Sequence, residues 1–108
     1  MKALLDYALA LDNEDAQGIA TLFSEHCYFS DGALRRMGRS DIEVRHSGDL
    51  AGVFTTLFSQ YSFSVEIKQM LPHAMIYIVR LNGEAFPCIG CATLDGDGRI
   101  SEYIIRPL

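Results

Sequence analysis

The stretch HAMIYIVRLNGEAFPCIGCATL, residues 73–94, decides the fold class. It holds two apolar runs, 73–81 and 85–94, whose length and β-branched content are typical of strands. The three residues between them, Asn82-Gly83-Glu84, are typical of a tight hairpin turn. The stretch therefore predicts two neighbouring antiparallel strands.

Strands on both sides extend this pair into a four-stranded meander. Upstream, FSVEIKQML (63–71) alternates, with Val65, Ile67 and Leu71 on one side. Downstream, the turn DGDG (95–98) precedes a strand predicted over 99–106. The turn also resembles part of a calcium loop, but Ile104 stands where such a loop needs its bidentate Glu, so the hairpin interpretation is favoured.

The first 61 residues predict three helices and one short strand. Helices are predicted over 2–11, about 15–24 and about 48–61, because apolar residues recur there at helical spacing, and Ser47 is the expected cap of the third. A strand is predicted over 27–30, and residues 33–47 give no regular pattern. Helices followed by a meander indicate an α+β domain with its helices on one face of the sheet.

Composition and charge narrow the class further. The chain has 108 residues, 49% of them apolar, which fits one domain (1–108) with one core. Its net charge of −5 argues against a nucleic-acid surface, and no apolar run approaches the ~20 residues of a membrane helix. Three cysteines without an export signal predict reduced thiols and a cytoplasmic protein.

The strand at 73–81 is apolar on both faces. Met75, Tyr77 and Val79 share one face, while Ile76 and Ile78 share the other with Ala74. An antiparallel strand with one solvent-exposed face would alternate apolar and polar residues instead. We therefore expect a homodimer through the outer sheet face, the alternative being partial cover by a loop.

Three segments resemble one superfamily, that of ketosteroid isomerase, SnoaL-like polyketide cyclases and nuclear transport factor 2. They are YALALDNEDAQGIATLFSEHCYFSDG (7–32), FSVEIKQ (63–69) and LDGDGRISEYII (94–105). The resemblance implies a strongly curved antiparallel or mixed sheet, wrapped by three helices into a cone with a pocket inside.

The resemblance also implies two catalytic residues. Tyr7 falls where steroid isomerases carry the phenol that hydrogen-bonds the substrate's carbonyl oxygen, and Asp31 falls where they carry the general base. The alternative for Tyr7 is a core tyrosine, and for Asp31 a turn-capping acid.

One part of the known site is missing. The second acid of those enzymes corresponds to Gly90 or Ala92, neither of which donates a side-chain hydrogen bond, and a supporting tyrosine falls at Thr55. An efficient steroid isomerase is therefore not expected. The expectation is a cofactor-free isomerase- or cyclase-type enzyme that transfers protons on a small hydrophobic carbonyl compound. The alternative is a non-catalytic ligand-binding or dimerisation module.

Side chains alternate between the two faces of each strand, and the superfamily resemblance implies which face of the sheet lines the pocket. Together they predict an apolar pocket for a small apolar or aromatic molecule. Gly90 and Ala92 favour open space there, whereas the alternative is a cone filled by its own side chains. The predicted substrate-binding residues are Phe54, Met75, Tyr77, Val79, Cys88, Gly90, Ala92, Tyr103 and Ile105.

No metal site is predicted. Cys88 and Cys91 spell C-x-x-C, but in mid-strand their side chains point to opposite faces. The spacing of His26, Cys27 and His73 is no zinc signature. The irregular segment is interpreted either as a solvated loop or as a lid that pairs with an anionic substrate through its arginines, which are Arg35, Arg36, Arg39 and Arg45.

Overall fold

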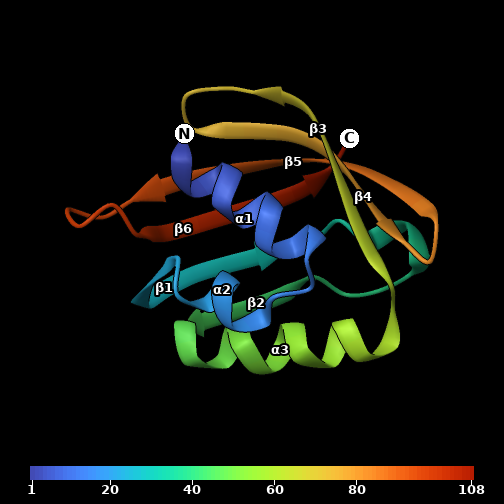
Figure 1. The fold of residues 1–108 in the computed structure, drawn as a ribbon, viewed down its shortest axis with the longest axis horizontal. Coiled ribbons are helices and arrows are strands. Elements are labelled where there is room, and N and C mark those ends of the chain that lie inside the picture. Colours follow the sequence, from blue (N-terminus) through green and yellow to red (C-terminus); the bar gives the residue numbers. More distant parts are fainter.

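The computed structural model describes residues 1–108 as three helices, one 3-10 turn and a six-stranded mixed sheet (Figure 1). The helices are α1 (Lys2–Asp12), α2 (Ala16–Ala20) and α3 (Ser47–Gln60), and η1 (Arg35–Met37) is the 3-10 turn. The strands are β1 (Phe23–Asp31), β2 (Ile42–His46), β3 (Phe63–Met70), β4 (Ala74–Leu81), β5 (Glu84–Leu94) and β6 (Ile100–Pro107).

The sheet has the order β2-β1-β6-β5-β4-β3. The predicted meander is confirmed, because β3 to β6 pair antiparallel in succession. β1 joins the far side of β6 in parallel and pairs antiparallel with β2. α3 therefore carries the chain from one edge of the sheet to the other.

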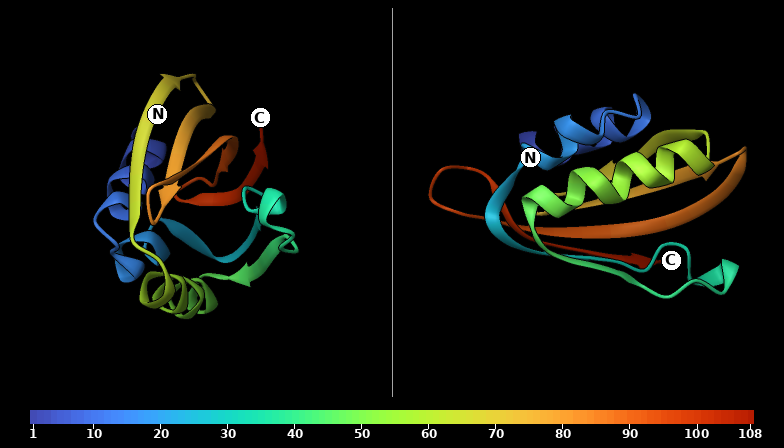
Figure 2. Two further views of the ribbon diagram at one scale, coloured as in Figure 1. Left: turned by 90° about the vertical axis from the view of Figure 1, so that its right-hand side faces the viewer. Right: turned by 90° about the horizontal axis from the view of Figure 1, so that it is seen from below.

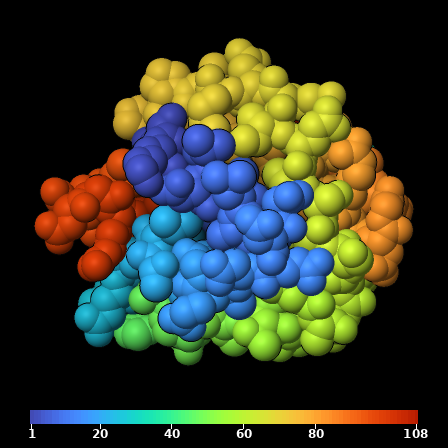
Figure 3. Space-filling model, viewed as in Figure 1, coloured from blue at the N-terminus to red at the C-terminus, as the bar shows by residue number.

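The sheet curls around the helices, which lie on its concave side (Figure 2). Register shifts leave extra residues in β1, β3 and β6, and such bulges bend and twist a strand. Figure 3 shows α1 and α2 lying across the middle of the helical face, with α3 below them. The α+β class and the cone architecture are thus confirmed, with a sheet that does not close.

The two faces predicted for β4 are confirmed. Met75, Tyr77 and Val79 are buried against the helices, whereas Ile76 and Ile78 are half-buried on the outer face. The first set builds the core, and the second leaves an apolar outer surface on the sheet.

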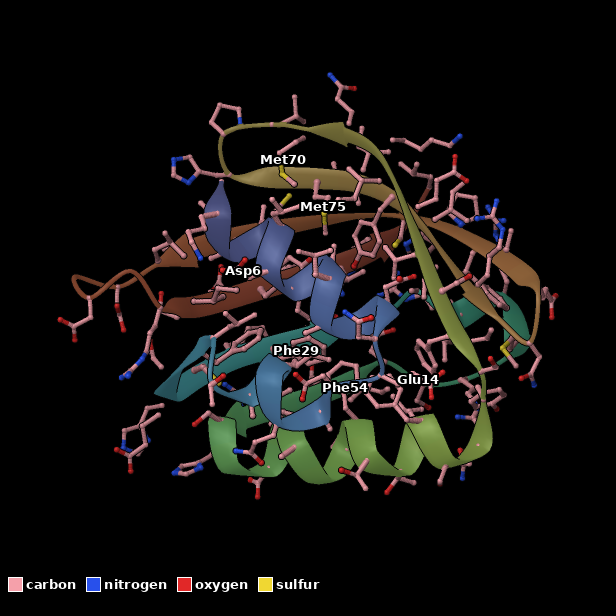
Figure 4. All side chains as sticks on the ribbon, viewed as in Figure 1. Asp6, Glu14, Phe29, Phe54, Met70 and Met75 are labelled. Carbon is pink, nitrogen blue, oxygen red and sulfur yellow. The ribbon has the colours of Figure 1, made fainter.

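The end of α1 is fixed to the edge strand β3. The amide of Val65 donates to Asp12 Oδ1 at 2.8 Å, and that of Phe63 donates to Glu14 Oε2 at 3.1 Å. Glu14, labelled in Figure 4, lies in the connection between α1 and α2 and adopts a φ of 54°. These bonds satisfy edge amides that would otherwise be open to pairing, and they hold α1 over the sheet.

The prediction of a helix over 15–24 was wrong at its end. α2 is capped by Asp15 and stops at Ala20, while Phe23 starts β1 and pairs with Ile100 of β6. Phe23 has the spacing of the helical stripe, but in the structure it begins β1 and its ring is buried in the core.

The irregular segment contains a strand that periodicity missed. β2 covers Ile42–His46, with Val44 buried among charged neighbours. It is short and lies at the sheet edge, where charged side chains are tolerated and the alternation is weak. The cap of α3 is His46, whose Nδ1 accepts from the Gly48 amide at 3.1 Å, and not the expected Ser47.

No helix in the structure has both the length and the apolar character required to cross a membrane.

Candidate functional site

A cavity of about 20 Å³ lies inside the cone, between α1, α3, the end of β1 and the inner face of β4. This is room for about one water molecule. Asp31 is the only ionisable carboxylate in an otherwise apolar and aromatic lining. The lining consists of Tyr7, Leu11, Asp31, Ala33, Leu34, Ile42, Phe54, Leu57, Phe63, Tyr77, Val79 and Leu81.

Tyr7 reaches the cavity from the buried face of α1. Its ring packs edge-on against Tyr103, with centroids 4.9 Å apart, and also against Phe23 and Phe54. Phe54 in turn meets Phe29 at 5.7 Å, and Figure 4 shows these two rings between α3 and β1. Tyr7 is therefore held by aromatic packing in a single place in the core.

Asp31 lies at the end of β1, where the sheet meets the irregular segment. Its Oδ1 accepts a hydrogen bond from the amide of Ala33 at 2.8 Å, which is the turn-capping role. No protein group donates to its Oδ2. The residue is only half-buried and also lines the cavity. Asp31 thus combines the two alternatives, because one oxygen caps the turn and the other is left without a protein donor.

Burial raises the pKa of the Asp31 carboxyl to about 6. The Ala33 hydrogen bond opposes this rise, the Asp41 carboxylate adds to it, and the Arg106 guanidinium opposes it. A carboxyl group that titrates near neutral pH suits a general base, because it takes up and releases a proton at modest cost.

Two further phenols lie beside Tyr7. The hydroxyls of Tyr77 and Tyr103 are 3.3 Å apart, and all three tyrosines are almost fully buried. Burial raises the pKa of Tyr7 well above its usual value, and the same cause raises those of Tyr77 and Tyr103. The three hydroxyls therefore remain protonated donors across the physiological range.

The structure brings together five of the predicted site residues. Tyr7, Asp31, Phe54, Tyr77 and Val79 line the cavity. The other six are buried on the same inner face but do not reach the cavity: Met75, Cys88, Gly90, Ala92, Tyr103 and Ile105.

Gly90 does not provide the open space that was expected of it. A Cβ built at Gly90 would lie 2.2 Å from the Tyr103 hydroxyl oxygen, because the phenol of Tyr103 lies over this glycine. The small residue at position 90 makes room for a neighbouring side chain and not for a ligand.

The prediction missed seven lining residues. Leu57 and Leu81 continue patterns that were visible, the stripe of α3 and the inner face of β4. Ala33, Leu34 and Ile42 come from the irregular segment, where isolated apolar residues in a polar stretch were the only signal. The remaining two are Leu11 and Phe63.

The four arginines of the irregular segment contact protein groups. Arg35 forms a two-bonded pair with Asp41 at 2.7 and 2.6 Å, and Arg36 donates to the Leu108 carbonyl. Arg39 lies over the Tyr61 ring and Arg45 over the Tyr28 ring. None of them lines the cavity, so the segment covers it with apolar side chains. Pairing of these arginines with an anionic substrate stays a prediction.

The side chains of Cys88 and Cys91 point to opposite faces of their strand, as predicted. Cys88 is buried and Cys91 exposed, on opposite faces of β5, and all three cysteines are free. No group of three His, Cys, Asp or Glu side chains is arranged to hold a metal ion. Asp95 accepts from the amides of Asp97 and Arg99, so the DGDG segment is a hairpin turn as predicted.

No family model and no curated protein matches the chain. Among solved structures it is similar to an NTF2-like protein of unknown function from Cytophaga hutchinsonii, at 15% identity and a TM-score of 0.74, covering 98% of this chain and 87% of that one. It is also similar to an LEH-like epoxide hydrolase from Mycobacterium tuberculosis, at 19% identity and a TM-score of 0.76, covering 99% of this chain and 80% of that one.

A third similar structure is SalBIII, an epoxide hydrolase/cyclase-like enzyme of pyran ring formation in the polyether salinomycin. Its identity is 13% and its TM-score 0.75, covering 99% of this chain and 88% of that one. At such identities the likeness concerns the fold. The chain therefore has the NTF2-like fold, shared with SnoaL-like, ketosteroid-isomerase-like and epoxide-hydrolase-like structures.

Proposed function

We propose that the protein binds a small apolar carbonyl compound and catalyses proton transfer on it without a cofactor, with Asp31 as general base and Tyr7 as hydrogen-bond donor. One observation carries the proposal: Asp31, whose pKa is raised to about 6, and the buried phenol Tyr7 line the same apolar cavity. A base and an oxygen-binding donor around one apolar space are the groups that enolisation needs.

The reaction follows from these two groups. Asp31 Oδ2 takes a proton from the carbon next to the carbonyl, and the C–H electron pair forms the C=C bond of an enolate. The carbonyl π pair moves to oxygen, where the Tyr7 hydroxyl donates a hydrogen bond to the developing charge. Asp31 then returns its proton to the same carbon or to another, which makes exchange or isomerisation the outcome.

Ligand binding in this proposal requires the cavity wall to move. A cavity of about 20 Å³ is far below the ~300 Å³ at which small-molecule pockets begin. Leu34 and Ile42 of the irregular segment form part of that wall. The segment is tied down by the exposed Arg35–Asp41 pair and by Arg39 on Tyr61, contacts that contribute little to stability. We therefore assign opening to residues 33–42.

The comparisons support the proposal only as far as a small-molecule enzyme. Two of the similar structures are named for epoxide hydrolase or cyclase chemistry. Both names describe small-molecule enzymes, which is consistent with a small-molecule site in the cone. They do not single out one substrate, and the proposal names only a carbonyl class.

The cavity volume favours a second candidate function, a non-catalytic ligand-binding or dimerisation module. The inner side chains nearly fill the cone, and Tyr103 occupies the space over Gly90. On this account Tyr7 is a core residue and Asp31 a turn cap. The two candidates differ in whether the wild-type protein turns over any ligand that it binds.

We also propose that the chain is a homodimer through the outer face of β4, β5 and β6, in the cytosol. On that face Ile78 pairs with Pro87, and Ile76 with Ile89. All four are half-buried in the single chain, and the helices lie on the other side of the sheet. A second copy would cover this uncharged centre, and interfaces are depleted of charge at their centre. The three free cysteines fit a reducing compartment.

The experiment that tests the enzymatic proposal compares wild type with Asp31→Asn on a panel of small cyclic ketones and enones. Ligands are found by thermal shift and turnover is then measured on those that bind. Asp97→Asn, in the exposed β5–β6 turn, is the matched control. We expect Asp31→Asn alone to abolish turnover. Turnover that survives in Asp31→Asn for every accepted ligand would rule the mechanism out, and wild-type protein that binds ligands but turns none of them over would favour the second candidate.

A further inference from the structure

Arg39 carries a positive charge that no acidic group of the protein neutralises. Its guanidinium lies over the Tyr61 ring, 5.3 Å from the ring centroid, and it forms no ion pair and no hydrogen bond within the chain. Stacking occupies the flat face of a guanidinium and leaves the N–H donors in its plane free to bind. Arg35, by contrast, is neutralised by Asp41 through two hydrogen bonds. Arg39 therefore has both its charge and its donors available to a ligand.

The contact between Arg39 and Tyr61 bridges two walls of the cavity. Leu34 and Ile42 form part of one wall, and Arg39 lies between them in the chain. Phe63 belongs to the other wall, and Tyr61 precedes it by two residues in extended backbone. Side chains two residues apart in an extended chain point to the same side, and Tyr61 packs against the core. Both walls lie at the same end of the cone, on the right in Figure 1, and we call this contact the rim.

The segment that covers the cavity is basic, although the protein as a whole is acidic. Residues 33–42 hold three arginines and one aspartate, a net charge of +2, whereas the whole chain carries −5. Inside the cavity Asp31 is the only carboxylate, and no cation lines it, so a second anion there would be repelled. An anionic group on a ligand is therefore favoured at the rim, while the apolar lining favours an uncharged body inside.

We propose that the ligand of this site carries a carboxylate, and that Arg39 binds this group at the rim while the apolar, carbonyl-bearing part enters the cavity. A guanidinium holds a carboxylate through two parallel N–H···O bonds, and one unpaired guanidinium matches one negative charge. Tyr61 is a positioning residue, because its ring holds the guanidinium at the rim. The inference rests on the function proposed above, since it places the carbonyl beside Asp31, and it narrows the substrate class to apolar keto acids.

The test compares each keto acid with its own uncharged amide. Wild-type protein is titrated with 4-oxocyclohexanecarboxylate and with 4-acetylbenzoate, each beside the corresponding carboxamide, and ligand-observed NMR gives the affinities. The ratio of the two affinities reports recognition of the charge, because a change in the opening of residues 33–42 affects both ligands alike. We expect wild type to prefer the carboxylate roughly fivefold, the upper end for one exposed charge pair, and to lose this preference in high salt.

Two arginines that stack on tyrosines provide the variant and its control. Arg39→Gln removes the charge at the rim and is expected to abolish the preference for the carboxylate. Tyr61→Leu, which removes the ring beneath the guanidinium, should reduce the preference, whereas Tyr61→Phe keeps the ring and should preserve it. Arg45→Gln is the matched control, because Arg45 lies over Tyr28 at 4.6 Å but is outside the cavity lining. It should leave the preference intact.

Equal affinity of wild type for carboxylate and carboxamide, or binding of neither, overturns the proposal. An equal loss of preference in Arg45→Gln and Arg39→Gln also overturns it, because the charge would then act through the field of the whole protein. Deuterium exchange next to the ketone is followed in the same samples. A preference that depends on Arg39 without any exchange leaves this inference standing and overturns the proposed function. Exchange of both ligands without a preference does the reverse.

Discussion

Asp31 and Tyr7 line one cavity although they come from different elements, the end of β1 and the middle of α1. The packing of α1 on the concave face of the sheet brings them together, and the bonds from β3 amides to Asp12 and Glu14 hold the helix there. The proposed function depends on this pairing.

The first prediction concerns stability. Folding raises the pKa of Asp31 from about 3.9 to about 6, so the folded protein binds more protons between these values and loses stability as pH rises through them. Asn at this position keeps the oxygen that accepts from Ala33 and cannot ionise. Asp31→Asn is therefore expected to be more stable than wild type at pH 7.5, by up to about 3 kcal/mol.

Urea unfolding at pH 7.5 and pH 3.5 measures this difference. The gain is expected to disappear at pH 3.5, where Asp31 is protonated in both states, and Asp97→Asn should show no gain at either pH. A less stable Asp31→Asn protein at pH 7.5 would mean that the carboxylate makes net favourable contacts in the fold.

The second prediction concerns the pH dependence of turnover. A general base must be ionised, so kcat/KM on any accepted ketone should rise with pH and level off above about 6. The profile of initial rates from pH 4.5 to 8 gives the inflection. A flat profile over this range would exclude Asp31 as the base.

The third prediction concerns Asp41, whose charge contributes to the raised pKa of Asp31. Asp41→Asn removes this repulsion and should lower the pKa of Asp31. It also breaks the pair with Arg35, freeing a guanidinium close to Gly32, next to Asp31 in the chain. Carbon NMR of the labelled carboxyl reports the titration directly. An unchanged or higher pKa in Asp41→Asn would contradict the electrostatic account of the site.

The fourth prediction concerns the outer sheet face. Ile76→Glu places a charge at the centre of the proposed interface and should convert a dimer to a monomer. Leu9→Glu, at an exposed apolar residue on α1, is the control and should leave the assembly unchanged. Light scattering on the eluting protein at micromolar concentration distinguishes the two states. A wild-type monomer would end the dimer proposal.

Most of the fold was predictable because its signals are local. The hairpin turn at Asn82-Gly83 and the apolar run of β4 predict neighbouring antiparallel strands, and the apolar stripe of α3 predicts its helix. β2 was not predictable in the same way. Its pairing with β1 joins residues that are distant in the sequence and exists only in the folded sheet. Its charged residues also mask the apolar pattern of the two residues that face inward.

The site was predictable only in part. Tyr7 and Asp31 followed from the superfamily resemblance, and Tyr77 and Val79 from strand alternation. The filling of the space over Gly90 could not be anticipated, because it depends on which rotamer Tyr103 adopts across a neighbouring strand. The cavity volume likewise depends on how side chains from distant segments, such as Leu34 and Phe63, pack against one another.

The most direct test of the central claim is deuterium exchange at the carbon next to a carbonyl. Small cyclic ketones are incubated in D₂O with wild type, Asp31→Asn or Tyr7→Phe, and the loss of the α-proton signal is followed by NMR. We predict exchange above the buffer rate with wild type, exchange at the buffer rate with Asp31→Asn, and a loss of about 100-fold or more with Tyr7→Phe. Equal exchange by wild type and Asp31→Asn would contradict the account.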